Sequence, residues 1–310
     1  MAVNSATTLE IGNTAQLPPV SRLSATLTDY WALTKPEVNL LIVIATFASF
    51  YQASSIDLHP FQLQRLIHTL FGTLIMASGA GTLNQFVERK FDAQMRRTSR
   101  RPLAAGRLHA VAALRFGVLL SIAGAAYLFV AVNALASLLA VLTLTNYLFL
   151  YTPLKRRTPL CTLVGAVPGA MPPPIGWAAA SGSLSGKAWI LYAALYMWQF
   201  PHFMSIARMY REDYARAGYL ILPNNGREQS VMAWLTLAPS IALLLVSLIA
   251  AATDSDNIFR SLATLILGSA LLYYGARLVL LRSRTAARQL LRASIVYLPL
   301  EFLTLVLGRH

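Results

Sequence analysis

The sequence predicts an all-α polytopic membrane protein with nine transmembrane helices, and three observations support this fold class. Hydrophobic residues make up 56% of the chain and charged residues only 12%. The mean hydropathy is +0.55, which is too apolar for an ordinary soluble domain. Nine apolar segments also approach the length of about 20 residues that a helix needs to cross about 30 Å of hydrocarbon.

The nine segments follow one another with short connections. The first is the shortest, and only a weak break at Asn133 separates the third segment from the fourth, so eight helices is the alternative count. We expect helices at 37–53, 66–87, 110–130, 134–151, 162–181, 188–207, 231–252, 259–281 and 290–307.

The positions of the lysines and arginines predict the orientation. Placing the N-terminus inside leaves few bases at the outer ends of the helices, as the positive-inside rule requires. The net charge of +14 is then a signal of topology. Nucleic acid as a partner has little support, because the bases are scattered over helix ends and no nucleic-acid-binding module is present. The outer bases would be Arg65, Lys187, Arg260 and Arg309.

Residues 1–30 are rich in Ser, Thr and Ala and contain no apolar run, so we expect a disordered cytoplasmic tail before a single membrane domain at 31–310. The tail has neither the charged start and apolar centre of a secretory signal nor the arginines of a transit peptide. A bacterial cell inner membrane is therefore the expected location. The lone Cys161 has no cysteine with which to form a disulfide or a metal site, and it is expected to fill apolar space.

Three oxygen-bearing side chains, Asn84, Glu88 and Asp92, follow one another at four-residue steps at the inner end of the second segment. In a helix each such step turns the side chain by only about 40°, so the three share one face. Magnesium takes one or two carboxylates and completes its shell with water and substrate phosphates, and arginines bind the remaining phosphate oxygens. The pattern predicts a diphosphate site beside a membrane. The arginines that follow are Arg96, Arg97, Arg100 and Arg101.

Two further loops on the predicted inner side carry related residues. The loop 199–230 places Glu212 and Asp213 among arginines, and the loop 151–160 contains three consecutive bases. The loops 84–109 and 199–230 both follow even-numbered helices, which indicates a weak parallel duplication around a central cavity. All three loops meet only if the bundle closes on itself. The bases are Arg208, Arg211 and Arg216 in the first of these loops and Lys155, Arg156 and Arg157 in the second.

Each of these features has a structural alternative. Glu88 and Asp92 are also placed to form interfacial salt bridges with neighbouring bases. His202 lies beside Pro201 near the inner end of the sixth segment, where it is a candidate metal ligand or base, or a cap for a freed carbonyl. The run at 168–176 interrupts the fifth segment and is expected to shape the cavity. Arg107, Arg284, Arg288 and Arg292 are expected to serve topology and lipid headgroups.

Three motifs give the chain a family resemblance: NQFVERKFDAQMRRTSRRPL, YTPLKRRTP, and WQFPHF followed by REDYARAGYLILP. With them, residues 30–305 resemble the UbiA-type intramembrane prenyltransferases, and specifically their branch of protohaem IX farnesyltransferases (haem O synthases). The resemblance implies nine helices around a central cavity that opens to the cytoplasm. It also implies the reaction in which haem B, farnesyl diphosphate and water give haem O and diphosphate, with haem B as a substrate and Mg²⁺ as the cofactor.

The resemblance assigns roles to individual residues. Glu88 stands where many superfamily members have Asp, and Ala217 occupies the position four residues after Asp213, so one magnesium ion is a safer expectation than two, with Glu212 as a substitute ligand. From its chemistry and position, and not from the resemblance, His202 is a candidate axial ligand of the haem iron. The implied magnesium ligands are Asn84, Glu88, Asp92 and Asp213. The residues implied to stabilise or bind the diphosphate are Lys155, Arg156, Arg97, Arg101 and Arg208.

Two other functions remain open at this point. A prenyltransferase acting on a quinone or chlorophyll precursor would share the metal site and differ in its acceptor. A secondary transporter of an anionic substrate would also have broken helices and basic mouths, although it would need access from both faces. Besides farnesyl diphosphate, haem B and membrane lipid, the resemblance leaves open a hand-over of the product to a haem A synthase or a terminal oxidase.

Overall fold

The computed structural model describes residues 19–54, 59–223, 226–254 and 258–307, and within these ranges every regular element is helical. The first half of the chain contains α1 (Pro19–Leu33), α2 (Pro36–Ala53), α3 (Pro60–Asp92), α4 (Ala110–Ala131), α5 (Ala134–Thr145), the π-helical η1 (Asn146–Tyr151) and α6 (Thr152–Leu154). The second half contains α7 (Cys161–Gly169), α8 (Pro172–Ser181), α9 (Gly186–Met209), α10 (Arg211–Arg216), α11 (Glu228–Asp254), α12 (Ile258–Leu281) and α13 (Arg284–Leu307).

Each of the nine predicted segments coincides with one helix or with a broken pair, which confirms the all-α fold. Within the described ranges, six segments are long and apolar enough to cross a membrane, and counting the bent pair α1 and α2 as one span gives seven. Nine spans and a cavity opening to the cytoplasm therefore stay predictions. The six are Pro60–Asp92, Ala110–Ala131, Ala134–Leu154, Glu228–Ala251, Ile258–Leu281 and Arg284–Leu307.

The expectation of a disordered tail over residues 1–30 is wrong in its second part, because residues 19–30 belong to α1. Residues 1–18 lie outside the described residues. Tertiary contacts override the weak helix propensity of this Ser- and Thr-rich stretch. Tyr30 packs edge-to-face on Phe116 with ring centroids 5.0 Å apart, and Asp29 pairs with Arg107 across 2.8 Å. Arg107, expected to serve topology, thus also holds α1 in place.

Two of the predicted spans are interrupted. The segment 134–151 changes from α5 into the π-helical η1, and the segment 162–181 is divided between α7 and α8 at Ala170 and Met171. Proline in the chain after Ala170 removes backbone donors, so the break follows from the sequence. At Gly176 of α8 a Cβ atom would lie 2.2 Å from the carbonyl oxygen of Thr46, so only glycine permits this contact between α8 and α2.

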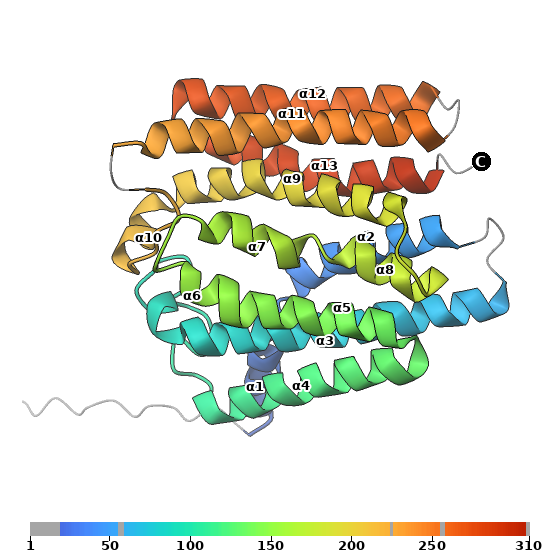
Figure 1. Ribbon diagram of the computed structural model, residues 1–310. Coiled ribbons are helices and arrows are strands. Elements are labelled where there is room, and N and C mark those ends of the chain that lie inside the picture. The colour runs from blue at the N-terminus through green and yellow to red at the C-terminus, as the bar shows by residue number, and fades with distance from the viewer. Residues whose placement is uncertain (1–18, 55–58, 224–225, 255–257, 308–310) are drawn as a thin grey trace, which may run out of the picture.

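The helices form a layered bundle (Figure 1). α3 and α4 lie along one side, α11 and α12 along the other, and α9 and α13 run beside α11 and α12. α2 and α8 pack on one another and contribute to both large hydrophobic clusters of the core. At one end of the bundle Figure 1 places α6, α10 and the chain that follows α3 together. The loops 84–109 and 199–230, which we term the first and second acidic loops, therefore lie at the same end of the bundle.

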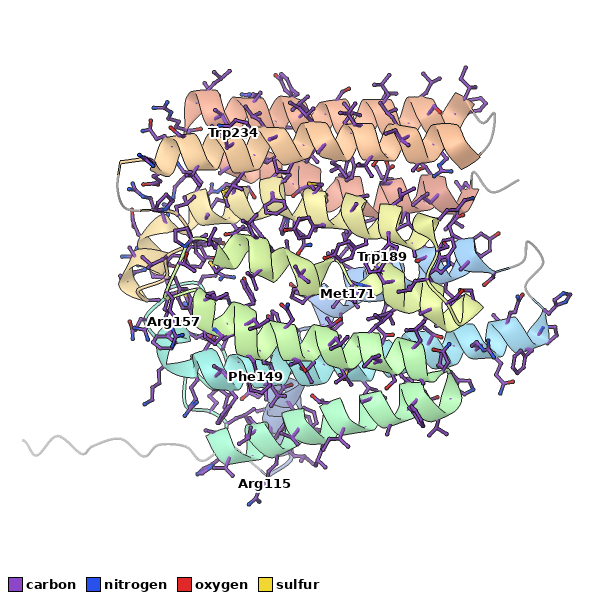
Figure 2. The ribbon with its side chains drawn as sticks, in the orientation of Figure 1. Arg115, Phe149, Arg157, Met171, Trp189 and Trp234 are labelled. Atoms are coloured by element: carbon purple, nitrogen blue, oxygen red, sulfur yellow. The ribbon has the colours of Figure 1, made fainter. Side chains whose placement is uncertain are left out.

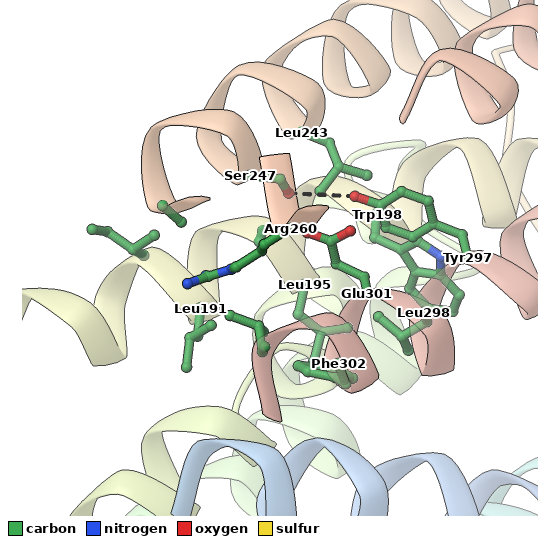
Figure 3. Close-up of a pocket in the computed structure, with 14 residues that line it drawn as sticks. Leu191, Leu195, Trp198, Leu243, Ser247, Arg260, Tyr297, Leu298, Glu301 and Phe302 are labelled. Atoms are coloured by element: carbon green, nitrogen blue, oxygen red, sulfur yellow. Dashed lines mark hydrogen bonds between the residues drawn. The ribbon is translucent and has the colours of Figure 1, made fainter. Parts of the chain in front are cut away.

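A cluster of buried polar side chains links α11, α12 and α13 inside the apolar core (Figure 3). The hydroxyls of Ser247 and Tyr297 lie 3.3 Å apart, and Thr264 donates to Glu301 Oε1 across 3.2 Å. Arg260 lies beside Glu301 in the same cavity, which has a volume of about 30 Å³. This volume suits about one water molecule, so the cavity is a packing feature of these helices.

Candidate active site

The predicted ligand face exists on the last turns of α3. Asn84, Glu88 and Asp92 are 1%, 4% and 1% exposed, respectively. No Gly or Pro interrupts the helix between them, so the four-residue spacing is preserved to the helix end at Asp92. The two carboxylates and the amide oxygen are therefore stacked on one buried face, as the spacing predicts.

Each of the three side chains is bound by a cation from a different segment. Lys35 Nζ donates to Asn84 Oδ1 across 2.7 Å. Lys155 Nζ donates to Glu88 Oε1 across 2.6 Å. Arg101 Nη1 donates to Asp92 Oδ2 across 2.8 Å. Buried ion pairs contribute little net stability after their desolvation, so two of them beside a third hydrogen-bonded lysine indicate a site for a charged ligand more than a device for stability.

Asp92 also has one carboxylate oxygen without a partner among the described residues. Its Oδ1 atom is buried and has no hydrogen-bond partner, whereas Thr98 Oγ1 fixes its carbonyl oxygen across 2.9 Å. In the described part of the chain no three His, Cys, Asp or Glu side chains form a group that could hold a metal. The donors fit magnesium, because this ion needs only one or two carboxylates when substrate phosphates and water complete its shell.

The electrostatics around Lys155 keep it charged. Burial is the largest single influence and disfavours the ammonium form, but the Glu88 carboxylate and the oxygens of Tyr151, Tyr147 and Tyr219 together outweigh it and hold the pKa of Lys155 well above its usual value. The ammonium also lies 4.5 Å from the ring centre of Tyr151 and 5.7 Å from that of Tyr219. Burial raises the pKa of Tyr219, so its phenol stays protonated. A permanent cation therefore stands beside the ligand face.

The three loops meet at one end of the bundle, as expected for a bundle that closes on itself. The backbone N–H of Arg97, in the first acidic loop, donates to Asp213 Oδ2 across 3.1 Å. The backbone N–H of Leu220, in the second acidic loop, donates to the carbonyl of Lys155 across 2.7 Å. Arg157 from the third loop lies at the same end in Figure 2. The two acidic loops and the loop 151–160 thus surround one end of α3.

Asp213 is held differently from the carboxylates of α3. Burial alone would raise its pKa, but backbone N–H groups of Arg97 and Arg96 and the Arg216 guanidinium hold the pKa of Asp213 below its usual range. Because its two oxygens already accept from Arg97 and Arg216, its contacts are those of a residue that fixes the loops together. Its assignment as a magnesium ligand stays a prediction.

The remaining predicted residues occupy varied surroundings. Arg156 lies 4.3 Å from the ring centre of Phe91, and Arg97 lies 5.1 Å from that of Tyr210, so both guanidinium groups border the site. Arg208 instead donates to the carbonyl of Arg282 at the junction of α12 and α13. This contact is structural, and a role of Arg208 in diphosphate binding stays a prediction.

His202 is directed toward α13. Its Nδ1 atom lies 2.8 Å from Ser294 Oγ, and its ring stacks on Trp198 with centroids 4.8 Å apart. Trp198 Nε1 donates to the carbonyl of the same Ser294 across 2.9 Å. One ring nitrogen of His202 is therefore engaged in helix packing, and a role as axial ligand stays a prediction that would require the other nitrogen.

Comparison with known families decides the class of protein that carries this site. Residues 41–298 match the UbiA prenyltransferase family. The chain belongs to this family. It is 47% identical to a protohaem IX farnesyltransferase of Solibacter usitatus, covering 91% of this chain and 98% of that one. It is 39% identical to that of Koribacter versatilis, covering 94% of this chain and 96% of that one.

Solved structures of UbiA homologues share the fold at low identity. A structure described as a digeranylgeranylglyceryl phosphate synthase has a TM-score of 0.72 at 15% identity and covers 91% of this chain and 98% of its own. A homologue from Archaeoglobus fulgidus, bound to DMAPP and Mg²⁺, has a TM-score of 0.62 at 13% identity and covers 89% and 99%. At these identities the likeness establishes the helical UbiA fold alone.

The predictions from the sequence missed Lys35, the cation bound to Asn84. Lys35 lies at the bend between α1 and α2 in a left-handed conformation with φ 55°, and Gln85 of α3 donates to the carbonyls of Ala32 and Leu33 just before it. A lysine directly before Pro36 and the first apolar segment was the available signal. In the sequence Lys35 resembles a base that only marks the inner side of the membrane. No local pattern shows that the bend between α1 and α2 packs against α3.

Proposed function

We propose that this UbiA prenyltransferase transfers the farnesyl group of farnesyl diphosphate to a vinyl group of haem B with addition of water, giving haem O and diphosphate. The observation that supports this most directly is the buried face of α3, where two carboxylates and an amide are each bound by a cation of the chain. The acceptor is inferred from the relatives of 47% and 39% identity, which are named protohaem IX farnesyltransferases.

Basic residues of the chain surround the place where the leaving diphosphate would lie. Mg²⁺, when bound at Asn84, Glu88 and Asp92, supplies Lewis-acid stabilisation of the diphosphate oxygens. Lys35, Lys155 and Arg101 now contact these ligands, so each lies within a side chain's reach of a diphosphate bound there. Arg97 and Arg156 border the same place. As the allylic C–O bond breaks, these cations stabilise the charge that develops on the leaving oxygen.

The apolar bundle protects the reactive carbon. Cleavage of the C–O bond gives an allylic farnesyl cation and diphosphate, and the haem vinyl group supplies the electron pair for the new C–C bond. Water then adds to the resulting carbocation next to the porphyrin and loses a proton, which leaves a hydroxyethylfarnesyl substituent. No covalent bond to the enzyme is needed. The helices exclude bulk water from the farnesyl cation before it meets the vinyl group.

The site has an expected place in the cell. By the positive-inside rule, the end of the bundle that carries α6 and α10 faces the cytoplasm, with the N-terminus on the same side of a bacterial inner membrane. Farnesyl diphosphate would then enter from the cytoplasm and the membrane together. Release of haem O into the membrane would permit hand-over to a haem A synthase or a terminal oxidase.

One competing function uses a different prenyl acceptor, and the other is transport without a chemical reaction. A UbiA enzyme acting on a quinone or chlorophyll precursor would use the same face of α3. A transporter of an anionic substrate would require access from the opposite end of the bundle, where the sequence places few charges. No contact among the described residues favours either alternative over haem farnesylation.

The decisive experiment is the conversion of haem by the purified protein. Protein in detergent is incubated with haem B, farnesyl diphosphate and Mg²⁺, and the extracted haem is identified by its mass and visible spectrum. A more hydrophobic haem carrying the farnesyl group and one added water is the expected product. Conversion of a hydroxybenzoate in place of haem would overturn the acceptor, and uptake into liposomes without covalent product would overturn the enzyme.

A further inference from the structure

A second cavity lies between α12 and α13, away from the residues of α3 that form the candidate active site. Its volume is about 390 Å³, within the range of small-molecule sites. Ala270 on α12 and Ala293 on α13 leave the space between the two helices open. The lining residues are Leu267, Ala270, Leu271, Tyr274, Gln289, Arg292, Ala293, Val296 and Tyr297.

The cavity, which we term the α12–α13 groove, is polar at one end and apolar at the other. The two helices are joined by a short connection and run antiparallel, so Tyr274, Gln289 and Arg292 gather toward the end that bears the active site. Leu267 and Val296 lie toward the opposite end. The Oε1 atom of Gln289 is buried and has no hydrogen-bond partner. The polar end of the groove therefore combines a hydrogen-bond acceptor without a partner, Gln289 Oε1, with the cation Arg292.

Among the residues that the structure describes, no acidic side chain pairs with the two arginines at this end of the groove. Arg288 and Arg292 are exposed, share a face of α13 at a four-residue spacing, and show no hydrogen bond or ion pair within the described ranges. Arg284, one turn earlier, donates instead to the carbonyl of Met209. The one carboxylate on α12 and α13 within the described ranges is Glu301, which lies about 13 Å farther along α13 than Arg292. It accepts a hydrogen bond from a threonine of α12.

We propose that the α12–α13 groove binds an anionic phospholipid of the phosphatidylglycerol type. Its phosphate binds Arg288 and Arg292, and a glycerol hydroxyl of its headgroup donates to the buried Oε1 of Gln289. One acyl chain follows the groove from Ala293 toward Val296. Basic pockets between transmembrane helices on the arginine-rich side bind anionic lipid headgroups in this way.

The first experiment measures lipid affinity by native mass spectrometry of delipidated protein in detergent, with phosphatidylglycerol and phosphatidylcholine as probes. Wild-type protein should retain phosphatidylglycerol in preference to phosphatidylcholine. Arg292→Gln should weaken binding of phosphatidylglycerol about five-fold, and Arg288→Gln with Arg292→Gln about thirty-fold. The matched control is Arg115→Gln, which removes an exposed arginine from α4 on the far side of the bundle (Figure 2) and should leave the affinity unchanged.

A second variant tests the groove separately from its charge. Ala270→Phe fills the cavity from an exposed position, so the fold should be retained while bound phosphatidylglycerol is lost despite intact arginines. A phosphatidylglycerol with a photoreactive acyl chain should label peptides of α12 and α13. Equal affinity for phosphatidylcholine, or unchanged binding by the double arginine variant, would overturn the proposal. Displacement of the lipid by farnesyl diphosphate would also overturn it, because the groove would then belong to the substrate path.

Discussion

The two acidic loops have similar compositions and different structures. Glu88 and Asp92 belong to the continuous helix α3, and their partners are side-chain cations from distant segments. Asp213 belongs to the six-residue α10, which follows a break at Tyr210, and its partners include a backbone N–H and an arginine three residues away. A long helix presents ligands on a rigid face, whereas a short helix between breaks ties loops together. We therefore infer that α3 supplies the ligands and that α10 closes the site.

The largest effect should come from α3 itself. Asp92→Asn removes a charge from the ligand face while keeping the shape, so kcat/KM for haem O formation should fall about 1,000-fold, measured by mass spectrometry of extracted haem. Thermal unfolding in detergent should change little. Glu37→Gln is the matched control, because this exposed acid in the first turn of α2 is not among the predicted ligands and its loss should leave nearly full activity. If instead the loss of activity tracks a loss of folded protein, Asp92 is a structural salt bridge.

The next effect concerns the cation beside Glu88. Lys155→Met should lower kcat about 100-fold because the leaving diphosphate loses a permanent charge, and steady-state kinetics with saturating farnesyl diphosphate measure it. The variant also leaves Glu88 buried and unpaired, which costs about 3–5 kcal/mol of stability. Adding Glu88→Gln should restore the melting temperature without restoring kcat. Arg157→Gln, in the same loop and exposed, is the control, and an equal loss there would contradict a specific role for Lys155.

A smaller effect, on the KM for farnesyl diphosphate, would distinguish the roles of the two acidic loops most directly. Asp213→Asn loosens the contact with the backbone of Arg97, so the KM for farnesyl diphosphate should rise about ten-fold while kcat stays within about two-fold. Titration of substrate at fixed Mg²⁺ gives both constants. A fall in kcat as large as that of Asp92→Asn would show that Asp213 is a metal ligand after all, and the distinction between α3 and α10 would fail.

The smallest effect is a pH dependence of stability. Because the pKa of Asp213 lies below its unfolded value, this carboxylate stabilises the fold above about pH 4 and loses its contribution as the pH falls through that value and below. The melting temperature of the wild type should therefore decline more steeply than that of Asp213→Asn between about pH 5 and pH 3. Parallel curves for the two proteins would contradict the ionic partners assigned to Asp213.

Much of the candidate site was predictable from local spacing. Asn84, Glu88 and Asp92 share a face because a helix repeats every 3.6 residues, and this holds wherever the helix lies. The meeting of the loops after α3 and α9 followed from connections at the same end of a bundle. Lys35 was missed because its importance depends on a bend that carries the chain back to α3. His202 received a functional assignment, although its hydrogen-bond partner Ser294 is on α13 and its ring packs on Trp198 of its own helix.

The sequence by itself determined the all-α class, the positions of the apolar helices and the shared face of Asn84, Glu88 and Asp92 on α3, because hydrophobic length and helical periodicity act locally. Only the tertiary structure decided which cation meets which ligand, that residues 19–30 form α1, and that Asp213 serves the backbone of another loop. Those outcomes depend on distant segments packing together, where close fits such as Gly176 against Thr46 fix the arrangement of the helices. Pairing of buried charges is set by that arrangement, and no local pattern records it.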